Sequence, residues 1–232
     1  MSSQFYQEYP KFHVAVDCII FGFECGQLKV LLQKRPFEPH SGEWSLMGGF
    51  VKQDEDVDDA AARVLTELTG LKDIYMRQVG AFGSVNRDSG DRVVSIAYFA
   101  LLDIDRVNKE LNREHSAYWE SIEQMPPLLF DHTEMVLQAR KILRESISKH
   151  PVGFQLLPPL FTLTQLQTLY EAIIGEIIDK RNFRKRVAEM PFIEKTDEID
   201  KVTSKRGAAL YRFNSRAYQR DKHFKLWPST TP

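Results

Sequence analysis

The chain has 232 residues, and its 31 Lys+Arg against 32 Asp+Glu give a net charge of −1, which excludes a strong overall attraction to nucleic acid or membranes. A hydrophobic fraction of 43% excludes disorder as the main state. The average conceals a split, because residues 1–150 carry 17 basic and 23 acidic side chains, whereas residues 151–232 carry 14 basic and 9 acidic ones. The two parts are therefore expected to meet different partners.

The cysteine content and the hydropathy of the sequence indicate in which cellular compartment the protein is found. Its two cysteines, Cys18 and Cys25, have no CxxC spacing, so the sequence predicts neither a disulfide framework nor a zinc site. The first ten residues lack the pattern of a signal peptide, and no apolar run approaches the roughly 18 residues of a membrane span. We therefore expect a cytoplasmic protein that has no membrane partner.

Strands and helices alternate irregularly in the first part, residues 1–150, which is typical of an α+β domain. Turn residues at 24–27 separate two runs rich in β-branched and aromatic residues, which predicts a hairpin. A polar turn, Ser84–Asp91, separates two later strands. The predicted strands are His13–Phe23, Leu28–Gln33, Tyr75–Phe82 and Arg92–Asp103.

Two helices are predicted in this part. The first is capped by Asp54 or Asp56 and runs to about Thr69, with Gly70 as the residue just past its end. The second begins after Asp131, because Glu134 follows at the spacing of a capping box. Its apolar residues repeat with helical period at Val136, Ala139, Leu143 and Ile147.

We place the domain boundary at His150–Gly153, where a proline and a glycine coincide with the change in charge. In residues 151–232, Thr164 and Gln167 have capping-box spacing for a helix that ends near Ile174. A basic helix over Asn182–Met190 and a hairpin complete the order of a winged helix-turn-helix, with a further short helix possible after Gly175. The hairpin is predicted from strands Phe192–Lys195 and Gly207–Phe213 with a charged tip, Thr196–Arg206.

The basic helix and the hairpin tip predict binding to double-stranded DNA. Phe183, Val187 and Met190 share one helical face, which leaves the basic side chains outward, where they can contact base edges and phosphates. Binding to RNA or to a protein remains an alternative, since winged helices also serve these partners. The candidate DNA-binding residues are Arg181, Asn182, Arg184, Lys185 and Arg186 on the helix, with Lys201, Thr203, Ser204, Lys205 and Arg206 at the tip.

The segment Gly49–Leu71 resembles the Nudix box, a loop-helix-loop signature written G-x5-E-x7-R-E-U-x-E-E-x-G-U, where U is a bulky aliphatic residue. Nudix enzymes use the glutamates of R-E-U-x-E-E to hold a divalent metal against a diphosphate. Here those three positions are Val64, Glu67 and Leu68, so the match indicates the fold and not the activity. The matching residues are Gly49, Glu55, Arg63, Leu65, Glu67, Gly70 and Leu71.

Positions 64, 67 and 68 lie on one helical face, and hard cations need oxygen ligands that Val64 and Leu68 do not offer. We therefore predict no catalytic residues, no metal site and no cofactor. Glu67 can pair with Arg63 one turn away, which would give both residues a structural role. The remaining alternative is that loop carboxylates replace the missing ligands, and its candidates are Glu43, Asp54 and Glu55.

A Nudix-like cleft without metal can still bind a ligand. Carboxylates, an amide and an indole face suit a polyhydroxylated ligand better than a diphosphate. Each residue also has a plainer interpretation: Asp17 could bond backbone, Trp44 could belong to the core and Arg35 could lie in solvent. The segment 86–92 is interpreted as a hairpin loop, and the histidines show no ligand spacing. The candidate effector-binding residues are Asp17, Gln33, Arg35, Glu43, Trp44 and Glu67.

A Nudix-like domain followed by a basic winged helix resembles the NrtR-type transcriptional regulators of bacteria. The segments that carry the resemblance include Val16–Phe21, Trp44–Leu71, Val93–Tyr98, Phe161–Thr164 and Asn182–Arg184. The resemblance implies a Nudix-like α/β/α sandwich followed by a winged helix-turn-helix. It also implies a homodimer that binds palindromic operator DNA and releases it when an effector binds the first domain.

Within this family the chain looks most like the arabinose-responsive AraR branch, which implies a small sugar effector, L-arabinose. Members of the nicotinamide branch respond to ADP-ribose instead. Two alternatives are therefore an ADP-ribose-responsive regulator of NAD metabolism and a Nudix hydrolase with an appended basic domain.

Overall fold

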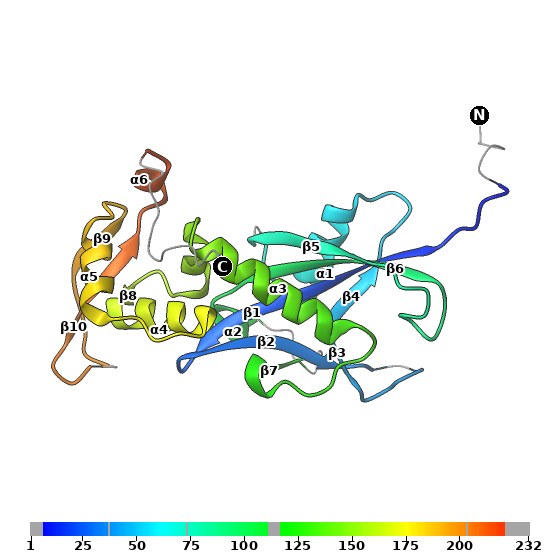
Figure 1. Ribbon diagram of the computed structural model, residues 1–232, viewed down its shortest axis with the longest axis horizontal. Helices are drawn as coiled ribbons and strands as arrows, with labels where there is room; N and C mark the ends of the chain where they lie inside the picture. The colour runs from blue at the N-terminus through cyan, green and yellow to red at the C-terminus, as the bar shows by residue number, and fades with distance from the viewer. Residues whose placement is uncertain (1–6, 37, 73, 111–116, 203, 221–232) are drawn as a thin grey trace.

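The computed structural model describes residues 7–36, 38–72, 74–110, 117–202 and 204–220. Two units lie next to each other along the long axis of the molecule (Figure 1). The larger unit is built around a mixed sheet, and the smaller one contains the basic helix.

The sheet of the larger unit has the strand order β3-β2-β1-β6-β5, with β4 pairing to β1 and β7 to β2. β1 and β2 form the predicted hairpin, in which Phe21 pairs with Val30. β1 runs parallel to β6, while the other pairings are antiparallel. The strands are β1 (His13–Glu24), β2 (Gln27–Lys34), β3 (Trp44–Ser45), β4 (Met47–Phe50), β5 (Met76–Phe82), β6 (Val93–Leu101) and β7 (Ala117–Ser121).

Helices cover both faces of this sheet, which confirms the predicted α/β/α sandwich (Figure 1). The alternation along β1 explains the layers, because successive side chains of a strand point to opposite faces. Val16 and Ile20 pack into the core that contains α1, whereas Ile19 and Phe21 pack into the core that contains α3. The helices are α1 (Val57–Thr69), α2 (Ile104–Glu110), the 3-10 turn η2 (Ile122–Gln124) and α3 (His132–Ile147).

The smaller unit is a winged helix with a three-stranded sheet in the order β8-β10-β9. On the basic helix α5, Phe183 and Val187 are 1% and 4% exposed, which confirms the predicted inward face. Its elements are β8 (Phe161–Thr162), α4 (Leu163–Ile174), α5 (Lys180–Ala188), β9 (Ile193–Asp200), β10 (Ala208–Phe213) and α6 (Ser215–Arg220).

One apolar core runs through both units. The connecting 3-10 turn η3 (Pro151–Leu156) buries Phe154, whose ring stacks on Phe213 with centroids 4.6 Å apart. Leu143 of α3 and Leu169 of α4 are fully buried in the same cluster. The winged helix is therefore packed directly against the α3 side of the sandwich, and the turn η3 that connects the two units is part of their shared core.

Several predicted helix caps are wrong in detail. The capping box of α4 is formed by Thr162 and Gln165 instead of Thr164 and Gln167, because β8 ends at Thr162 and the helix begins one residue later. Asp56 occupies the N-cap position of α1, yet its side chain makes no capping hydrogen bond. Asp131 likewise precedes α3 without capping it.

Other boundaries also differ from the predictions. α5 begins at Lys180 because Asp179 accepts a hydrogen bond from the Asn182 backbone N–H, and in the described chain no separate helix lies between α4 and α5. β9 extends to Asp200, so the hairpin tip is shorter than Thr196–Arg206. The strands β3, β4, β7 and β8 and the helices α2 and α6, all of them short, are not among the predicted elements.

Candidate functional site

A cleft of about 390 Å³ opens beside the C-terminal half of α1 and the first turn of α3. β1, β2 and β4 form its floor, and the loop that contains Arg87 forms one wall. The lining includes the predicted residues Asp17, Gln33, Arg35 and Glu67. Four of the predicted effector residues are therefore brought together from three separate elements.

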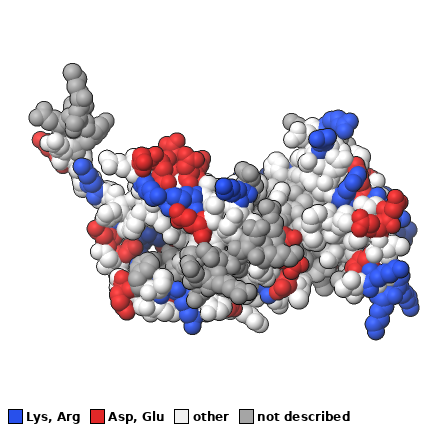
Figure 2. All heavy atoms as spheres, turned by 180° about the vertical axis from the view of Figure 1, so that it is seen from behind, with Lys and Arg blue, Asp and Glu red and all other residues white. Residues whose placement is uncertain are grey.

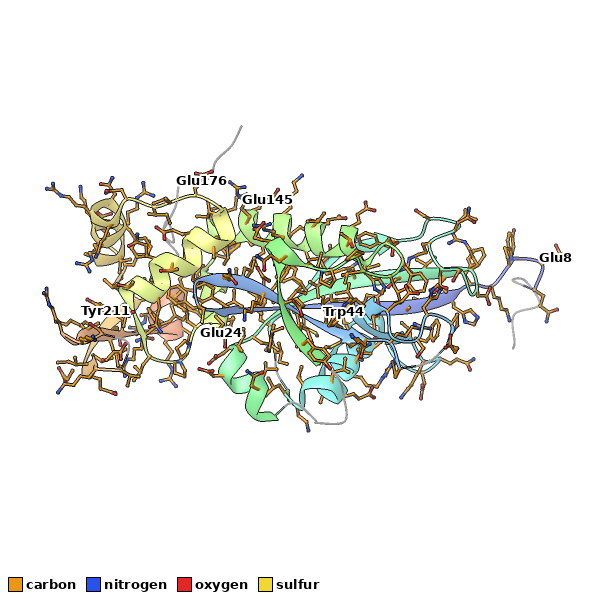
Figure 3. All side chains as sticks on the ribbon, turned by 90° about the horizontal axis from the view of Figure 1, so that it is seen from below. Glu8, Glu24, Trp44, Glu145, Glu176 and Tyr211 are labelled. Carbon is orange, nitrogen blue, oxygen red and sulfur yellow. The ribbon has the colours of Figure 1, made fainter. Side chains whose placement is uncertain are left out.

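Glu43 and Trp44 do not line this cleft, which corrects the prediction for both. β3 pairs with β2 so that Gln33 lies opposite Ser45 and Lys34 opposite Trp44. Because side chains alternate along a strand, Gln33 and Ser45 face the cleft while Trp44 faces away. The Trp44 ring packs edge-on against Tyr118, with centroids 5.5 Å apart. Trp44 is labelled in Figure 3. Glu43 is exposed and bonds to His40 at 3.0 Å.

Asp17 is the buried carboxylate at the base of the cleft. It is 7% exposed, and its Oδ2 accepts a hydrogen bond of 2.6 Å from the hydroxyl of Ser95 on the neighbouring strand. Arg87 Nη2 and His132 Nε2 each lie 3.6 Å from its oxygens. A Cβ at Gly48 would collide with this carboxylate, so the glycine permits β4 to approach it. Asp17 therefore holds together the walls of the cleft and does not bond only to neighbouring backbone.

Arg87 is the most deeply placed cation of the cleft, with a side chain only 3% exposed. Its Nε and Nη2 donate to the two oxygens of Asp131 at 2.9 and 2.7 Å. Burial alone would lower the pKa of Arg87, but the hydrogen bonds to Asp131 and the charge of Asp17 outweigh burial and raise it. The guanidinium is therefore charged and held in a fixed orientation.

His132 is a neutral histidine next to this ion pair. Its Nδ1 accepts a hydrogen bond from the Leu46 backbone N–H at 3.2 Å, which leaves the proton on Nε2, facing Asp17. Burial lowers the pKa of His132, although the charge of Asp17 acts in the opposite direction. The ring thus donates toward Asp17 without adding a second positive charge.

The α1 wall of the cleft lacks the ligands of a metal centre. Val64 and Leu68 line it as buried apolar side chains, and Glu67 lies between them in sequence. Arg63 donates to Glu55 at 2.6 and 2.9 Å and lies 3.4 Å from Glu67. The hydrogen bonds from Arg63 are the main cause that lowers the pKa of Glu55 to about 2.

Two of the loop carboxylates that could replace the missing metal ligands, Glu43 and Glu55, are not available to a metal ion in the cleft. Both oxygens of Glu55 are used by Arg63 and by the Lys52 N–H, and Glu43 lies outside the cleft. Among the described residues no three His, Cys, Asp or Glu side chains are placed to hold a metal ion. The side chains of this wall therefore do not fit the divalent metal that Nudix enzymes require.

Several residues of the cleft are not among the predicted effector residues. The sequence places Arg87 and Asp88 in a hairpin loop and gives no signal for His132, yet all three line the cleft. Ser45 could have been predicted from the alternation of side chains along a strand, because it pairs with Gln33 and faces the same side of the sheet. Arg87 and Asp131 are 44 residues apart, so no local pattern signals that they pair.

The second candidate surface is formed by α5 and the β9–β10 hairpin. Arg181, Asn182, Arg184 and Lys185 are exposed, while Arg186 is half-buried. Arg184 lines a groove of about 770 Å³ between α5 and the hairpin, together with Lys195 and Tyr211. Figure 2 shows basic side chains projecting from this end of the molecule.

The hairpin tip carries the remaining predicted residues. Lys201, Lys205 and Arg206 are exposed, and Ser204 is half-buried. Thr203, which was also predicted to contact DNA, lies outside the described residues. No helix in the described parts of the chain is long and apolar enough to span a membrane.

Comparison with protein families gives two matches. Residues 11–145 match the NUDIX domain, and residues 153–213 match the NrtR DNA-binding winged helix domain. The first match ends before the predicted boundary between residues 150 and 151, and the second begins after it.

Individual relatives agree with these family matches. A protein of Acinetobacter baylyi named ADPR responsive transcriptional repressor NtrR is 37% identical over 91% of this chain and 86% of its own length. The crystal structure of Shewanella oneidensis NrtR complexed with a 27mer DNA matches with a TM-score of 0.78 and 30% identity, covering 89% of this chain and 95% of that one. An ADP-ribose pyrophosphatase of Methanocaldococcus jannaschii is 33% identical over 53% of this chain and 70% of its own.

The Acinetobacter baylyi and Shewanella oneidensis proteins span both units and are NrtR-type proteins, so they do not support the predicted closeness to the arabinose-responsive AraR branch. They do support the predicted family, together with the matches to both of its domains. The chain therefore belongs to the NrtR-type transcriptional regulators, in which a Nudix domain is joined to a DNA-binding winged helix domain.

Proposed function

We propose that this protein is a transcriptional repressor that binds operator DNA and releases it when ADP-ribose occupies the Nudix cleft. The Acinetobacter baylyi relative, which matches over 91% of this chain, is named for its response to ADP-ribose. The resemblance to the AraR branch implies L-arabinose instead, and the argument for a polyhydroxylated ligand uses a site that includes Glu43 and Trp44. Neither side chain lines the cleft.

The observation that carries the proposal is the pair of guanidinium groups, Arg35 and Arg87, on the cleft wall. Guanidinium groups bind phosphate oxygens with two parallel hydrogen bonds, whereas a neutral pentose has no charge to neutralise. Asp17, Asp88 and Glu67 can accept hydrogen bonds from ribose hydroxyls. A ligand that combines a diphosphate with sugar rings matches both kinds of group.

The size of the cleft agrees with this choice. A cavity of roughly 150 Å³ holds a benzene-sized ring, so about 390 Å³ leaves room for more than one monosaccharide ring. Ligand sites of roughly 300–1,000 Å³ are typical for small molecules of this complexity.

The same cleft is proposed to bind ADP-ribose without cleaving it. Val64 and Leu68 replace two carboxylates on the face that would hold metal, and Arg63 engages the nearby carboxylate of Glu55. Diphosphate hydrolysis in this fold depends on metal-bound oxygen ligands that these side chains do not supply. The domain therefore acts as a sensor.

On the DNA side, α5 is proposed to enter the major groove, with Arg184 and Asn182 toward base edges and Lys205 of the hairpin tip toward a phosphate. One helix contacts only a few base pairs, so we expect a homodimer that binds two half-sites of a palindrome. The exposed positions of these side chains support this assignment.

A selected duplex provides the test. Duplexes bound by the full chain are first selected from a randomised library, and the complex is then titrated with ADP-ribose, L-arabinose, AMP and ribose 5-phosphate. We expect ADP-ribose alone to release the DNA at concentrations near its Kd. Release by arabinose and not by ADP-ribose would show that the effector assignment is wrong.

Hydrolysis is measured separately, by AMP release from ADP-ribose in the presence of Mg²⁺ or Mn²⁺. The Glu67→Ala variant serves as the control, because it removes the remaining carboxylate among the three ligand positions of the Nudix box. We expect equal, background rates for both proteins. A clearly faster unmodified protein would instead support the hydrolase alternative.

A further inference from the structure

The first turn of α3 contains a helix cap that the protein leaves unformed. Asp131 and Glu134 have capping-box spacing, but the Asp131 side chain makes no hydrogen bond to the helix. The carboxylate instead accepts both hydrogen bonds from Arg87. By contrast, Thr162 and Asp179 cap α4 and α5 in the expected way. Asp131 therefore has two alternative partners, the Arg87 guanidinium or the backbone N–H groups of its own helix.

Arg87 also has two alternative partners. It lines the effector cleft, and its Nη2 is shared between Asp131 at 2.7 Å and Asp17 at 3.6 Å. Phosphate oxygens in the cleft would compete with Asp131 for this group, because both bind guanidinium through the same planar pair of N–H donors. Binding of a diphosphate is thus expected to weaken the attachment of Asp131 to Arg87.

The other end of α3 reaches the winged helix. α3 has 16 residues, which at the rise of an α-helix is about 24 Å. At this end, Arg144 Nη2 lies 3.0 Å from Glu176 Oε1. Figure 3 shows Glu176 beside Glu145, where the end of α3 meets the end of α4. Fully buried Leu143 and Ile147 join α3 to the core that continues into the winged helix.

Glu176 belongs to the short segment that sets the start of α5. Within this segment the Ile178 N–H donates to Glu171 of α4 at 2.9 Å, and Asp179 caps α5 through the Asn182 N–H at 2.8 Å. Glu176 is therefore four residues from the first residue of the basic helix, Lys180, and it is tied to α3 on one side and to α4 on the other.

We propose that α3 carries the effector signal from the cleft to the DNA-binding helix. Phosphate oxygens withdraw Arg87 from Asp131, and Asp131 then caps α3 and changes the position of its first turn. α3 moves as a rigid helix and shifts the segment of Glu176 through Arg144, which turns α5 away from its DNA-binding position. This inference rests on the proposed function, since it takes a diphosphate ligand as the effector.

The main test separates α3 coupling from effector binding. For each protein the operator Kd is measured with and without saturating ADP-ribose on the selected duplex, and ADP-ribose binding to the free chain is measured by calorimetry. For the unmodified protein we expect a ratio of the two operator Kd values of about 5–150, the usual size of such coupling. Arg144→Ala and Glu176→Gln should each reduce this ratio by about threefold or more, while ADP-ribose still saturates the protein.

Arg140→Ala is the matched control. Arg140 lies one turn earlier on α3 and pairs with Glu123 of the same domain, so it makes no ion pair to the winged helix among the described residues. The ratio should stay unchanged in this variant. The double variant Arg144→Glu with Glu176→Arg restores the ion pair with the two charges exchanged. It should recover most of the ratio of operator Kd values that the single variants lose.

A second variant tests the start of the helix. Asp131→Asn keeps a capping side chain but loses the charge that holds Arg87. We expect it to bind the operator more weakly than the unmodified protein without any ADP-ribose, and to respond less to ADP-ribose.

The results distinguish two failures. If ADP-ribose does not change operator affinity of the unmodified protein, the proposed function is wrong and this inference falls with it. If ADP-ribose releases the unmodified protein and releases the Arg144→Ala, Glu176→Gln and Asp131→Asn variants with the same ratio, the function stands and the role of α3 is wrong.

Discussion

The effector cleft and the DNA-binding surface use arginine in opposite ways. In the cleft the Arg87 side chain is 3% exposed and donates hydrogen bonds to both oxygens of the Asp131 carboxylate. On α5, Arg184 is exposed and makes no ion pair within the described chain. A buried, paired guanidinium holds a site in one shape, whereas an exposed one is available for a partner and keeps its conformational freedom.

This contrast predicts that removing an arginine charge from the cleft lowers the free energy of unfolding, whereas removing one from α5 weakens DNA binding. The largest effect is expected for Arg87→Met, which leaves Asp131 and Asp17 without their shared cation. We expect the free energy of unfolding to fall by about 3–5 kcal/mol, the usual cost when one member of a buried ion pair is removed. Urea denaturation followed by circular dichroism measures the change.

Arg140→Met is the comparison for this measurement. Its partner Glu123 has a side chain that is 70% exposed, so the loss should be at most about 1 kcal/mol. Equal losses for the two variants would mean that the Arg87 pair does not have the stabilising role assigned to it.

The second expected effect is on DNA binding. Arg184→Ala should weaken binding to the selected duplex by about 1–3 kcal/mol and relax the preference at one base pair, as expected for a bidentate contact to guanine. Its unfolding free energy should hardly change, because the side chain is exposed. Fluorescence anisotropy with duplexes that carry single substitutions gives both results. Lys141→Ala, an exposed change on α3, controls for the loss of one charge.

The same contrast explains what the sequence could predict. The DNA-binding surface follows from local information, since Phe183 and Val187 mark the buried face of α5 and leave its basic residues outward. The Nudix box likewise located Val64, Glu67 and Leu68 on one wall of the cleft. In both cases the residues that matter lie within one helix, whose periodicity fixes their directions.

The rest of the cleft depends on contacts between distant segments. Ser95 bonds to Asp17 across 78 residues of sequence and Arg87 bonds to Asp131 across 44, and helical or strand periodicity gives no information about such pairs. The side on which Trp44 lies is set by the pairing of β3 with β2, because a shift of one residue in register would reverse it.

The third prediction concerns pH. Burial lowers the pKa of His132 below its ordinary value of 6.5, so the unfolded chain binds a proton more readily than the folded one below this pH. The stability contributed by neutral His132 is therefore complete above about pH 6.5 and is lost as the pH falls, by at most about 1.4 kcal/mol per pH unit for one proton.

His132→Asn tests this dependence, because the Asn oxygen can accept the Leu46 N–H in place of Nδ1 without titrating. The difference in unfolding free energy between the two proteins should shrink as the pH is lowered from 7 to 5. A difference that stays constant over this range would show that His132 does not titrate differently in the folded chain.

The smallest effect is expected at the hairpin tip, where it sharpens the contrast between base and phosphate contacts. Lys205 is exposed and lies on the tip next to Arg206. A lysine that neutralises one phosphate releases about one counterion, so Lys205→Ala should reduce the slope of log K against log[salt] by about 1. Because phosphates are the same at every step, the loss of affinity should be equal for selected and substituted duplexes, unlike that of Arg184→Ala. A change in base preference with an unaltered salt slope would instead place the hairpin tip against base edges.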